Sequence, residues 1–310
     1  MNLLTKFLVL LLFFVSTLLA QSKPYSIFYH FAGTYNDPAA MAREETIRGS
    51  FFYRQFFTQF GENPIFFGTD VSFPIKNLYL GAGYLYNKSN FVRDHEIDLN
   101  IAYKLYLGYE FEHSLTLGIA PIFEIQTYLP INPTLQDLFD PVFPIQNQVN
   151  YFKPNVRLGL DYVYKKLSVR LALPYLLTTI RDKDGTIDNK SSFNFSQLPV
   201  FAAVGYQFEI NENLSLQTHL QQRLDLRYDV DLLAYLMIKD MIGVGLYYST
   251  IDKMGLVLSG TVLKSITFMY HFSYGFSSGY TNSAGIHELG LLWKIPPLQL
   301  MNLKNSRLTN

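Results

Sequence analysis

The feature that most constrains this chain is a two-residue repeat of apolar and polar side chains that recurs from Arg48 almost to the end. Between Glu96 and Leu107 the odd-numbered positions are Ile, Leu, Ile, Tyr, Leu and Leu, whereas the even-numbered positions are mostly polar or charged. The same alternation occurs in 214–226 and 266–274. Side chains of a β-strand point alternately to its two faces, so the repeat predicts strands with one apolar face each.

Fourteen segments carry this pattern, and many of them are nine or more residues long. A typical strand of a soluble protein has about 5–6 residues, whereas a strand tilted across a lipid bilayer needs about 9–11. The segments span residues 48–58, 64–74, 78–87, 94–107, 113–127, 154–165, 167–179, 198–210, 213–226, 230–239, 242–250, 255–263, 265–275 and 286–294. Their length and number predict an all-β fold, an antiparallel transmembrane β-barrel of about 14 strands.

The connections between the segments differ in length at the two ends of the predicted barrel. Six of them are short and polar or charged, and they span 74–77, 108–112, 165–166, 211–213, 239–241 and 264–265. Three long connections, 128–153, 180–197 and 276–285, lie at the opposite end. Bacterial outer-membrane barrels have short periplasmic turns and longer extracellular loops, so this asymmetry supports the same fold.

A soluble, secreted β-sandwich would also alternate, with its apolar face turned inward. The composition favours the barrel, because the chain has 23 Tyr and 26 Phe and only 16% charged residues. An average domain is roughly 25% charged. Tyr and Phe also cluster near the predicted strand ends, as in the aromatic girdles of outer-membrane barrels. We therefore expect a barrel with its apolar face turned outward.

The two ends of the chain lie outside the repeat. Residues 1–20 read as a signal peptide cleaved near Ala20, since about 14 apolar residues fall short of the ~20 that a spanning helix needs. Residues 21–47 form an N-terminal segment that either lies in the periplasm or plugs part of the lumen. The barrel then covers 48–295, and 296–310 form a C-terminal tail.

The composition excludes several classes of function. The chain has no Cys, which rules out disulfides, Fe–S clusters, thiolate zinc sites and Cys nucleophiles. Its formal net charge is zero, which argues against a nucleic-acid partner. Residues 182–188 resemble part of a calcium loop but lack the closing Glu of an EF-hand, so a polar loop tip is the simpler interpretation. We expect no cofactor, and cation binding by this loop stays open.

Polar residues on the predicted inner face are the remaining candidates for chemistry. His219, Arg223 and Asp225 share one strand face, which would suit either a proton relay of an outer-membrane hydrolase or a wet lumen wall of paired charges. We favour the wall and expect no enzyme. The candidate lumen lining comprises Asp98, Lys104, Arg157, Asp161, Arg170, His219, Arg223 and Asp225.

The long connection 128–153 is unusually apolar for a solvated loop. It combines four Pro residues with apolar side chains, among them Leu135, Leu138, Phe139 and Phe143. Such a loop either folds over the barrel mouth and docks a partner, or packs on itself without one. Both interpretations are kept, and these four residues are the candidate docking site.

Three motifs stand near the two ends of the mature chain. They are Asn36-Asp37-Pro38-Ala39-Ala40 and Tyr53-Arg54-Gln55-Phe56 at the start, and Ile286-His287-Glu288-Leu289 at the end. In this order they resemble the Asn-Pro-Ala turn, the first strand and the closing Ser-His-Glu signature of the PorP/SprF family. The chain departs from the pattern at Asp37, Phe56 and Ile286, which suggests a divergent member.

The resemblance implies an outer-membrane barrel of Bacteroidota, tied to type IX secretion and gliding motility. Its partners would be membrane lipid, other secretion-system components and a large secreted adhesin-type protein at the cell surface. We expect the motif residues Asn36, Pro38, Arg54, Gln55, His287 and Glu288 to hold the first and last strands together through cross-strand pairs. The alternative function is a channel or transporter for small solutes, which would use the lumen lining for selectivity.

Overall fold

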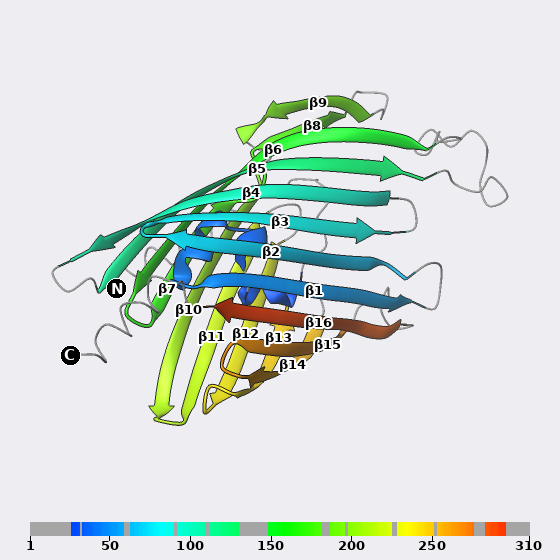
Figure 1. Ribbon diagram of the computed structural model, residues 1–310. Helices are drawn as coiled ribbons and strands as arrows, with labels where there is room; N and C mark the ends of the chain where they lie inside the picture. The colour runs from blue at the N-terminus through cyan, green and yellow to red at the C-terminus, as the bar shows by residue number, and fades with distance from the viewer. Residues whose placement is uncertain are drawn as a thin grey trace, which may run out of the picture.

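A computed structural model gives the protein as a closed antiparallel β-barrel of fourteen strands, so the predicted fold class is confirmed (Figure 1). The structure describes residues 26–31, 33–58, 63–89, 92–108, 112–129, 148–181, 187–195, 198–224, 228–250, 253–275 and 283–295. The barrel closes where the first strand pairs with the last. The predicted signal peptide and C-terminal tail lie outside the described residues.

The strand bounds agree with the predicted segments to within a few residues in most cases. The barrel strands are β1 (Ile47–Thr58), β2 (Ile65–Ile75), β3 (Leu78–Lys88), β4 (Val92–Leu107), β5 (His113–Tyr128), β6 (Val149–Tyr164), β7 (Leu167–Leu173), β10 (Val200–Asn211), β11 (Leu214–Leu224), β12 (Tyr228–Ile238), β13 (Ile242–Ser249), β14 (Lys253–Val262), β15 (Ile266–Gly275) and β16 (Ser283–Ile295). Tight turns join them at one end, here the short-turn end.

The burial pattern is that of a membrane barrel and not of a sandwich. Along β4 the apolar Ile97, Leu99 and Ile101 are about half exposed, at 51%, 47% and 44%, whereas Asp98 and Asn100 are buried. A soluble protein would bury the apolar set and expose the polar one. The apolar face therefore points outward to lipid and the polar face lines the lumen, as in outer-membrane barrels.

The structure corrects the predicted bounds at the start of β6 and at the end of β7. β6 begins at Val149 instead of 154, so Pro154 lies inside it. The carbonyl of Val156 accepts a hydrogen bond from Leu176 N–H at 3.0 Å. Backbone groups two residues apart in a strand point to the same side, so the nitrogen of Pro154 faces that side too, where the described β7 has no residue opposite it. Proline costs no ladder hydrogen bond there.

The second correction concerns β7, which ends at Leu173, before Pro174, and not at 179. The predicted loop 180–197 contains most of a separate hairpin of β8 (Leu177–Arg181) and β9 (Ile187–Phe193). This hairpin lies outside the ring of strands, next to β6 (Figure 1).

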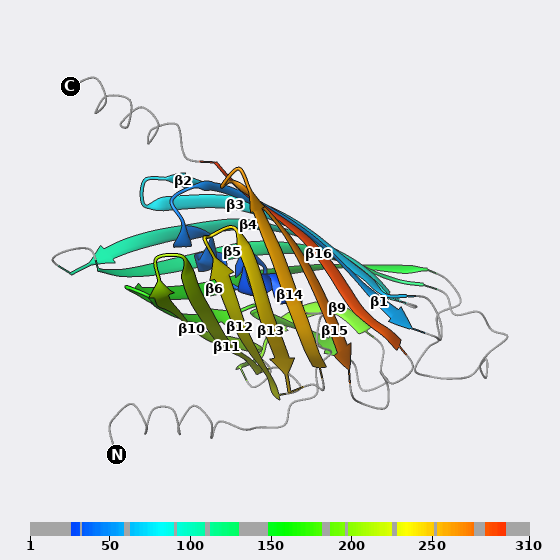
Figure 2. The ribbon, with the colours of Figure 1, turned by 90° about the horizontal axis from the view of Figure 1, so that it is seen from below.

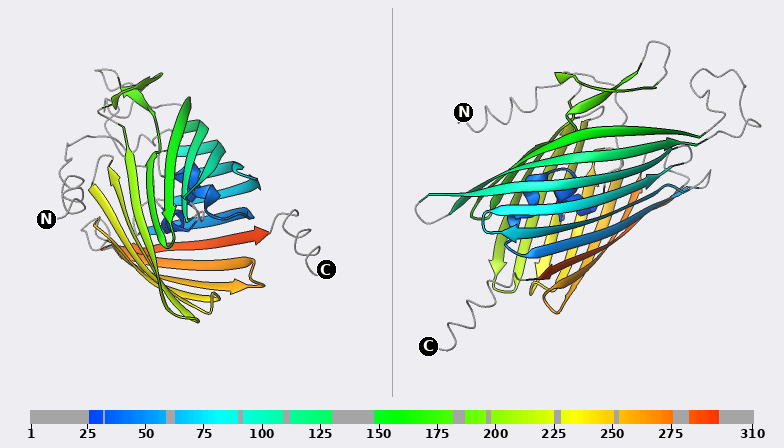
Figure 3. Two further views of the ribbon diagram at one scale, coloured as in Figure 1. Left: turned by 90° about the vertical axis from the view of Figure 1, so that its left-hand side faces the viewer. Right: turned by 45° about the horizontal axis from the view of Figure 1, so that its top comes forward.

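Three short 3₁₀ helices precede the barrel: η1 (Ile27–His30), η2 (Gly33–Tyr35) and η3 (Pro38–Arg43). The end-on view in the left panel of Figure 3 shows these dark-blue helices within the ring of strands, and Figure 2 shows them behind the β10–β15 wall. Their side chains are almost all buried. None of the helices among the described residues is long and apolar enough to cross a membrane.

Candidate functional site

The candidate functional site is the lumen, which residues 26–31 and 33–46 occupy. We call these residues, with their three 3₁₀ helices, the plug. The largest cluster of buried apolar side chains in the described part of the chain joins the plug to the wall. Phe52 of β1 is at its centre, where Tyr35 meets it edge-on at 5.2 Å between ring centroids and Phe28 stacks on it at 6.0 Å. The plug is therefore packed against the wall as a core would be.

The first residues of the plug are held by one carboxylate. Glu288 of β16 accepts a hydrogen bond from Ser26 hydroxyl at 2.9 Å and another from Ile27 N–H at 3.2 Å. Arg54 of β1 lies 3.4 Å from the same carboxylate, and His271 of β15 lies 3.8 Å from it. With these four neighbours, the buried carboxylate of β16 joins β1, β15 and the plug at one point.

The structure brings together four of the six family-motif residues. Arg54 is opposite Glu288 and Gln55 is opposite His287 in the β1–β16 ladder that closes the barrel. Asn36 and Pro38 are not at this seam. Pro38 is the first residue of η3, where it lies against the wall at β5 and β6. The expected closure role therefore does not extend to Asn36 and Pro38.

The other end of the plug is held by charges and by a backbone contact. Arg43 Nε donates to Asp161 of β6 at 2.6 Å, and Lys104 Nζ of β4 donates to the Ala42 carbonyl at 3.1 Å. At the start of η3, Asp37 caps the helix by accepting from Ala39 N–H at 2.9 Å. Burial, together with Asp161 close by, raises the pKa of Asp37 to about 7.

Two glycines give η3 its place on the wall. Gly118 of β5 and Gly159 of β6 are directly opposite one another in the ladder, and both face η3. A Cβ on Gly118 would lie 2.7 Å from the carbonyl carbon of Pro38 and 2.9 Å from Ala39 Cα, and one on Gly159 would overlap the Asp37 carboxylate. Any side chain at these positions would force the helix away from the wall.

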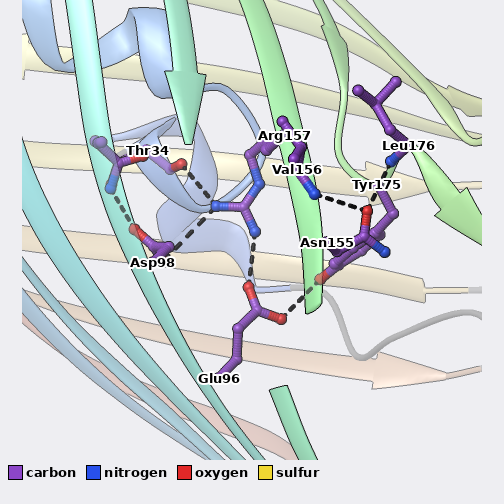
Figure 4. A network of polar contacts seen from close by, with 9 residues as sticks. Thr34, Glu96, Asp98, Asn155, Val156, Arg157, Tyr175 and Leu176 are labelled. Atoms are coloured by element: carbon purple, nitrogen blue, oxygen red, sulfur yellow. Dashed lines mark hydrogen bonds and ion pairs between the residues drawn. The ribbon is translucent and has the colours of Figure 1, made fainter. Parts of the chain in front are cut away.

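Arg157 of β6 is at the centre of a network that joins the plug to the wall (Figure 4). Its guanidinium is fully buried and donates to Glu96 at 2.7 Å and to the Thr34 carbonyl of the plug at 3.4 Å. Asp98 lies 3.7 Å away, and Tyr175 donates to the second Glu96 oxygen at 3.0 Å. The charges of Arg157 and Glu96 are therefore compensated inside the protein.

The residues predicted to line the lumen differ in what they contact in the structure. Four of them bond to the plug: Lys104 and Asp161 to its η3 end, and Arg157 and Arg170 to its backbone, with Arg170 donating to the Tyr29 carbonyl at 3.5 Å. His219 lies 5.7 Å from the ring of His30, and Arg223 pairs with Asp229 of β12. Asp98 is buried beside Arg157, while Asp225 lies outside the described residues.

The candidate docking residues Leu135, Leu138, Phe139 and Phe143 also lie outside the described residues, as does most of the 182–188 loop. Among the described residues, no three His, Asp or Glu side chains are placed to hold a metal ion.

Sequence reasoning missed the residues that make the plug. Arg43, the Gly118–Gly159 pair and Asp70, which accepts from Thr34 and Ser50, were not singled out. A possible signal was that Gly118 and Gly159 fall on the inner face of long strands, where glycine weakens a strand unless something approaches closely.

Comparison with known proteins decides the family. The family described as "Type IX secretion system membrane protein PorP/SprF" matches residues 18–293, which is nearly the whole chain. The chain belongs to the PorP/SprF family. The resemblance found at the two ends of the sequence is thereby confirmed, and the chain is an outer-membrane β-barrel of a type IX secretion family. A search of curated protein sequences gave no match.

Solved structures share the fold of this PorP/SprF protein at low sequence identity. The toluene transporter TbuX of Ralstonia pickettii is 10% identical, with a TM-score of 0.56 over 85% of this chain and 93% of its own. The CymD monoaromatic hydrocarbon channel is also 10% identical, with a TM-score of 0.53 over 89% of this chain and 95% of its own. At such identity the likeness concerns the fold alone.

Proposed function

We propose that this protein is a non-enzymatic component of the type IX secretion system that helps export or anchor a large secreted surface protein. It would act in the outer membrane of a Bacteroidota cell, after cleavage of its signal peptide near Ala20. In this proposal the partner binds at the long-loop end of the barrel, where the apolar connection 128–153 emerges.

The observation that carries the proposal is the plug. Four of the polar side chains that would line a channel bond instead to the plug, and its aromatic residues pack against the wall. A barrel filled in this way is suited to serve as a rigid platform in the membrane. Family membership supplies the system in which such a platform would act.

Transport of small solutes is the second candidate. The fold shared with TbuX and CymD, whose names describe a toluene transporter and a hydrocarbon channel, is the observation in its favour. Transport of a solute through the barrel would require the plug to leave at least part of the lumen. Conductance in planar lipid bilayers at neutral pH separates the two candidates, because a platform conducts little and a standing channel conducts steadily.

The test of the proposal is affinity purification of a tagged copy from native outer membrane, with quantitative mass spectrometry of the co-eluting proteins. We expect a large secreted protein or other secretion-system components at near-stoichiometric yield. A variant with residues 131–147 replaced by a short Gly/Ser linker should lose the partner. A matched control, in which the turn residues Glu212 and Asn213 at the opposite end are changed to Gly, should keep it.

Recovery of the barrel and lipid alone, under mild detergent, would contradict the proposal. So would equal recovery of the partner with the linker variant and the control, because the docking site would then lie elsewhere.

A further inference from the structure

The two ends of the plug are attached to the wall in different ways. η3 approaches the wall through its backbone, at Gly118 and Gly159, and it contacts β3, β4, β5 and β6. Residues 26–31 reach the wall through aromatic rings, through the hydrogen bonds of Ser26 and Ile27 with Glu288, and through the Tyr29 carbonyl, which accepts from Arg170. The two halves of the plug are therefore attached to the wall by separate sets of contacts.

A histidine is at the end of η1, in the interior of the barrel. His30 is 3% exposed, and its ring lies 5.7 Å from His219 of β11 and 6.4 Å from Tyr247 of β13. The Tyr247 ring in turn meets His271 of β15 at 5.4 Å. Three histidines from the plug and two separate strands thus come within one small region of the lumen.

Four basic side chains, His219, Arg170, His271 and Arg223, act on the charge of His30. The basic groups lie on three strands: Arg170 on β7, His219 and Arg223 on β11, and His271 on β15. Two carboxylates lie behind this first set of groups: Asp231 on β12, which accepts from Tyr247 of β13, and Glu288 on β16, which lies beside His271. The two carboxylates are already engaged, Asp231 by Tyr247 and Gln221 and Glu288 by Arg54 and the plug N-terminus.

Burial and the cations nearby set the sign of the effect of pH. Desolvation, with His219 and Arg170 next in importance, lowers the pKa of His30 well below that of an ordinary histidine. A group whose pKa is lowered in the bound state favours the released state as the pH falls. The free energy that holds η1 on the wall has its full value above about pH 6.5, the ordinary histidine pKa, and it declines as the pH falls below that.

We propose that η1 is a proton-operated half of the plug: protonation of His30 releases residues 26–31 from the wall at β1, β2, β7 and β11–β16 while η3 stays on β3–β6. The released half opens a path through the lumen lined by His219, Tyr247 and His271. This goes beyond the proposed function, because it assigns a gating device to the barrel whatever partner binds outside.

The experiment measures single-channel conductance of the full chain in planar bilayers between about pH 7.5 and pH 5. Each pKa unit by which burial disfavours protonated His30 changes the release equilibrium about tenfold, so we expect the open probability to rise at least about tenfold over this range. The variant His30→Asn cannot gain the proton and should stay closed throughout.

The matched control is His95→Asn on the lipid-facing side of β4, where the ring bonds to Tyr84. It should open with acid as the wild type does. Heat-dependent electrophoretic mobility confirms that each variant is a folded barrel. A spin label on Phe31→Cys, in a chain with no other cysteine, should gain mobility in acid in step with the conductance.

The proposal is overturned if the wild type is equally silent at both pH values. It is also overturned if a folded H30N variant opens at the same pH as the wild type, or if the label at position 31 does not gain mobility in acid.

Discussion

A single methyl group on Gly118 should loosen the plug without unfolding the barrel. In Gly118→Ala the new Cβ would lie 2.7 Å from the carbonyl carbon of Pro38 and 2.9 Å from Ala39 Cα, which are backbone atoms that cannot rotate away. Overpacking of this kind costs about 1–3 kcal/mol, which would raise the open fraction of the η3 end about 5- to 150-fold. The barrel strands lose no hydrogen bond, because alanine keeps the backbone of β5 unchanged.

The assay uses the absence of cysteine from the chain. Ala40, which is buried in η3, is replaced by Cys, and the rate of its reaction with a small hydrophilic maleimide reports how often the plug leaves the wall. We expect the rate to rise with G118A by the factor above. Barrel unfolding, followed by the single Trp293, should stay nearly unchanged.

Gly260→Ala is the matched control, since a Cβ there meets nothing within 4 Å. It should leave the labelling rate at position 40 unchanged and stabilise β14 slightly, because alanine lowers the entropy of the unfolded chain. The reasoning is refuted if the thiol at position 40 reacts at the same rate in the G118A and G260A backgrounds, or if both variants loosen the plug equally.

Three further predictions concern the polar anchors. Asp161→Ala leaves Arg43 without its partner, which should destabilise the η3 end by about 3–5 kcal/mol in the maleimide assay, and a double variant that also replaces Arg43 by Met should recover most of it. Glu288→Gln should weaken the attachment of the η1 end to the wall by about 1.5–3 kcal/mol. The thiol of Phe31→Cys should then react faster than in a chain with Glu288 intact. The pKa of Asp37 is about 7 in the plug and about 4 in an unfolded chain. The attachment of η3 to the wall should therefore be strongest below pH 4, and its free energy should fall by up to about 4 kcal/mol as the pH rises to 7. Asp37→Asn, which can still cap the helix, should abolish that pH dependence. A slope that persists in D37N would assign the pH dependence to another group.

The strands were predictable because period two is a local property of a strand with unlike faces. Their bounds follow the sequence closely where a polar turn ends the repeat, as at Lys165-Lys166. The prediction began β6 at 154 instead of Val149. Whether Pro154 interrupts a ladder depends on a neighbouring strand that the sequence does not reveal. The direction of the apolar face was inferred from strand length and aromatic content, and burial along β4 confirms it.

The plug could not be read in the same way. Its helices are too short to show a period, and what fixes them is their fit to distant residues such as Gly118 and Gly159. The motif residues Arg54 and Glu288 were found by resemblance, and the ladder places them opposite one another. That Glu288 also holds Ser26, 262 positions away in the chain, was beyond any local pattern.

The plug fills the lumen of the native barrel, and protection of its buried residues from solvent tests this most directly. The measurement is maleimide labelling of Ala40→Cys in native outer-membrane fragments at neutral pH, beside Glu212→Cys in the exposed β10–β11 turn as the accessible reference. We expect the thiol at position 212 to react within minutes, whereas the thiol at position 40 stays protected until the protein is denatured. Equally fast reaction at the two positions would contradict it, because the plug would then not occupy the barrel.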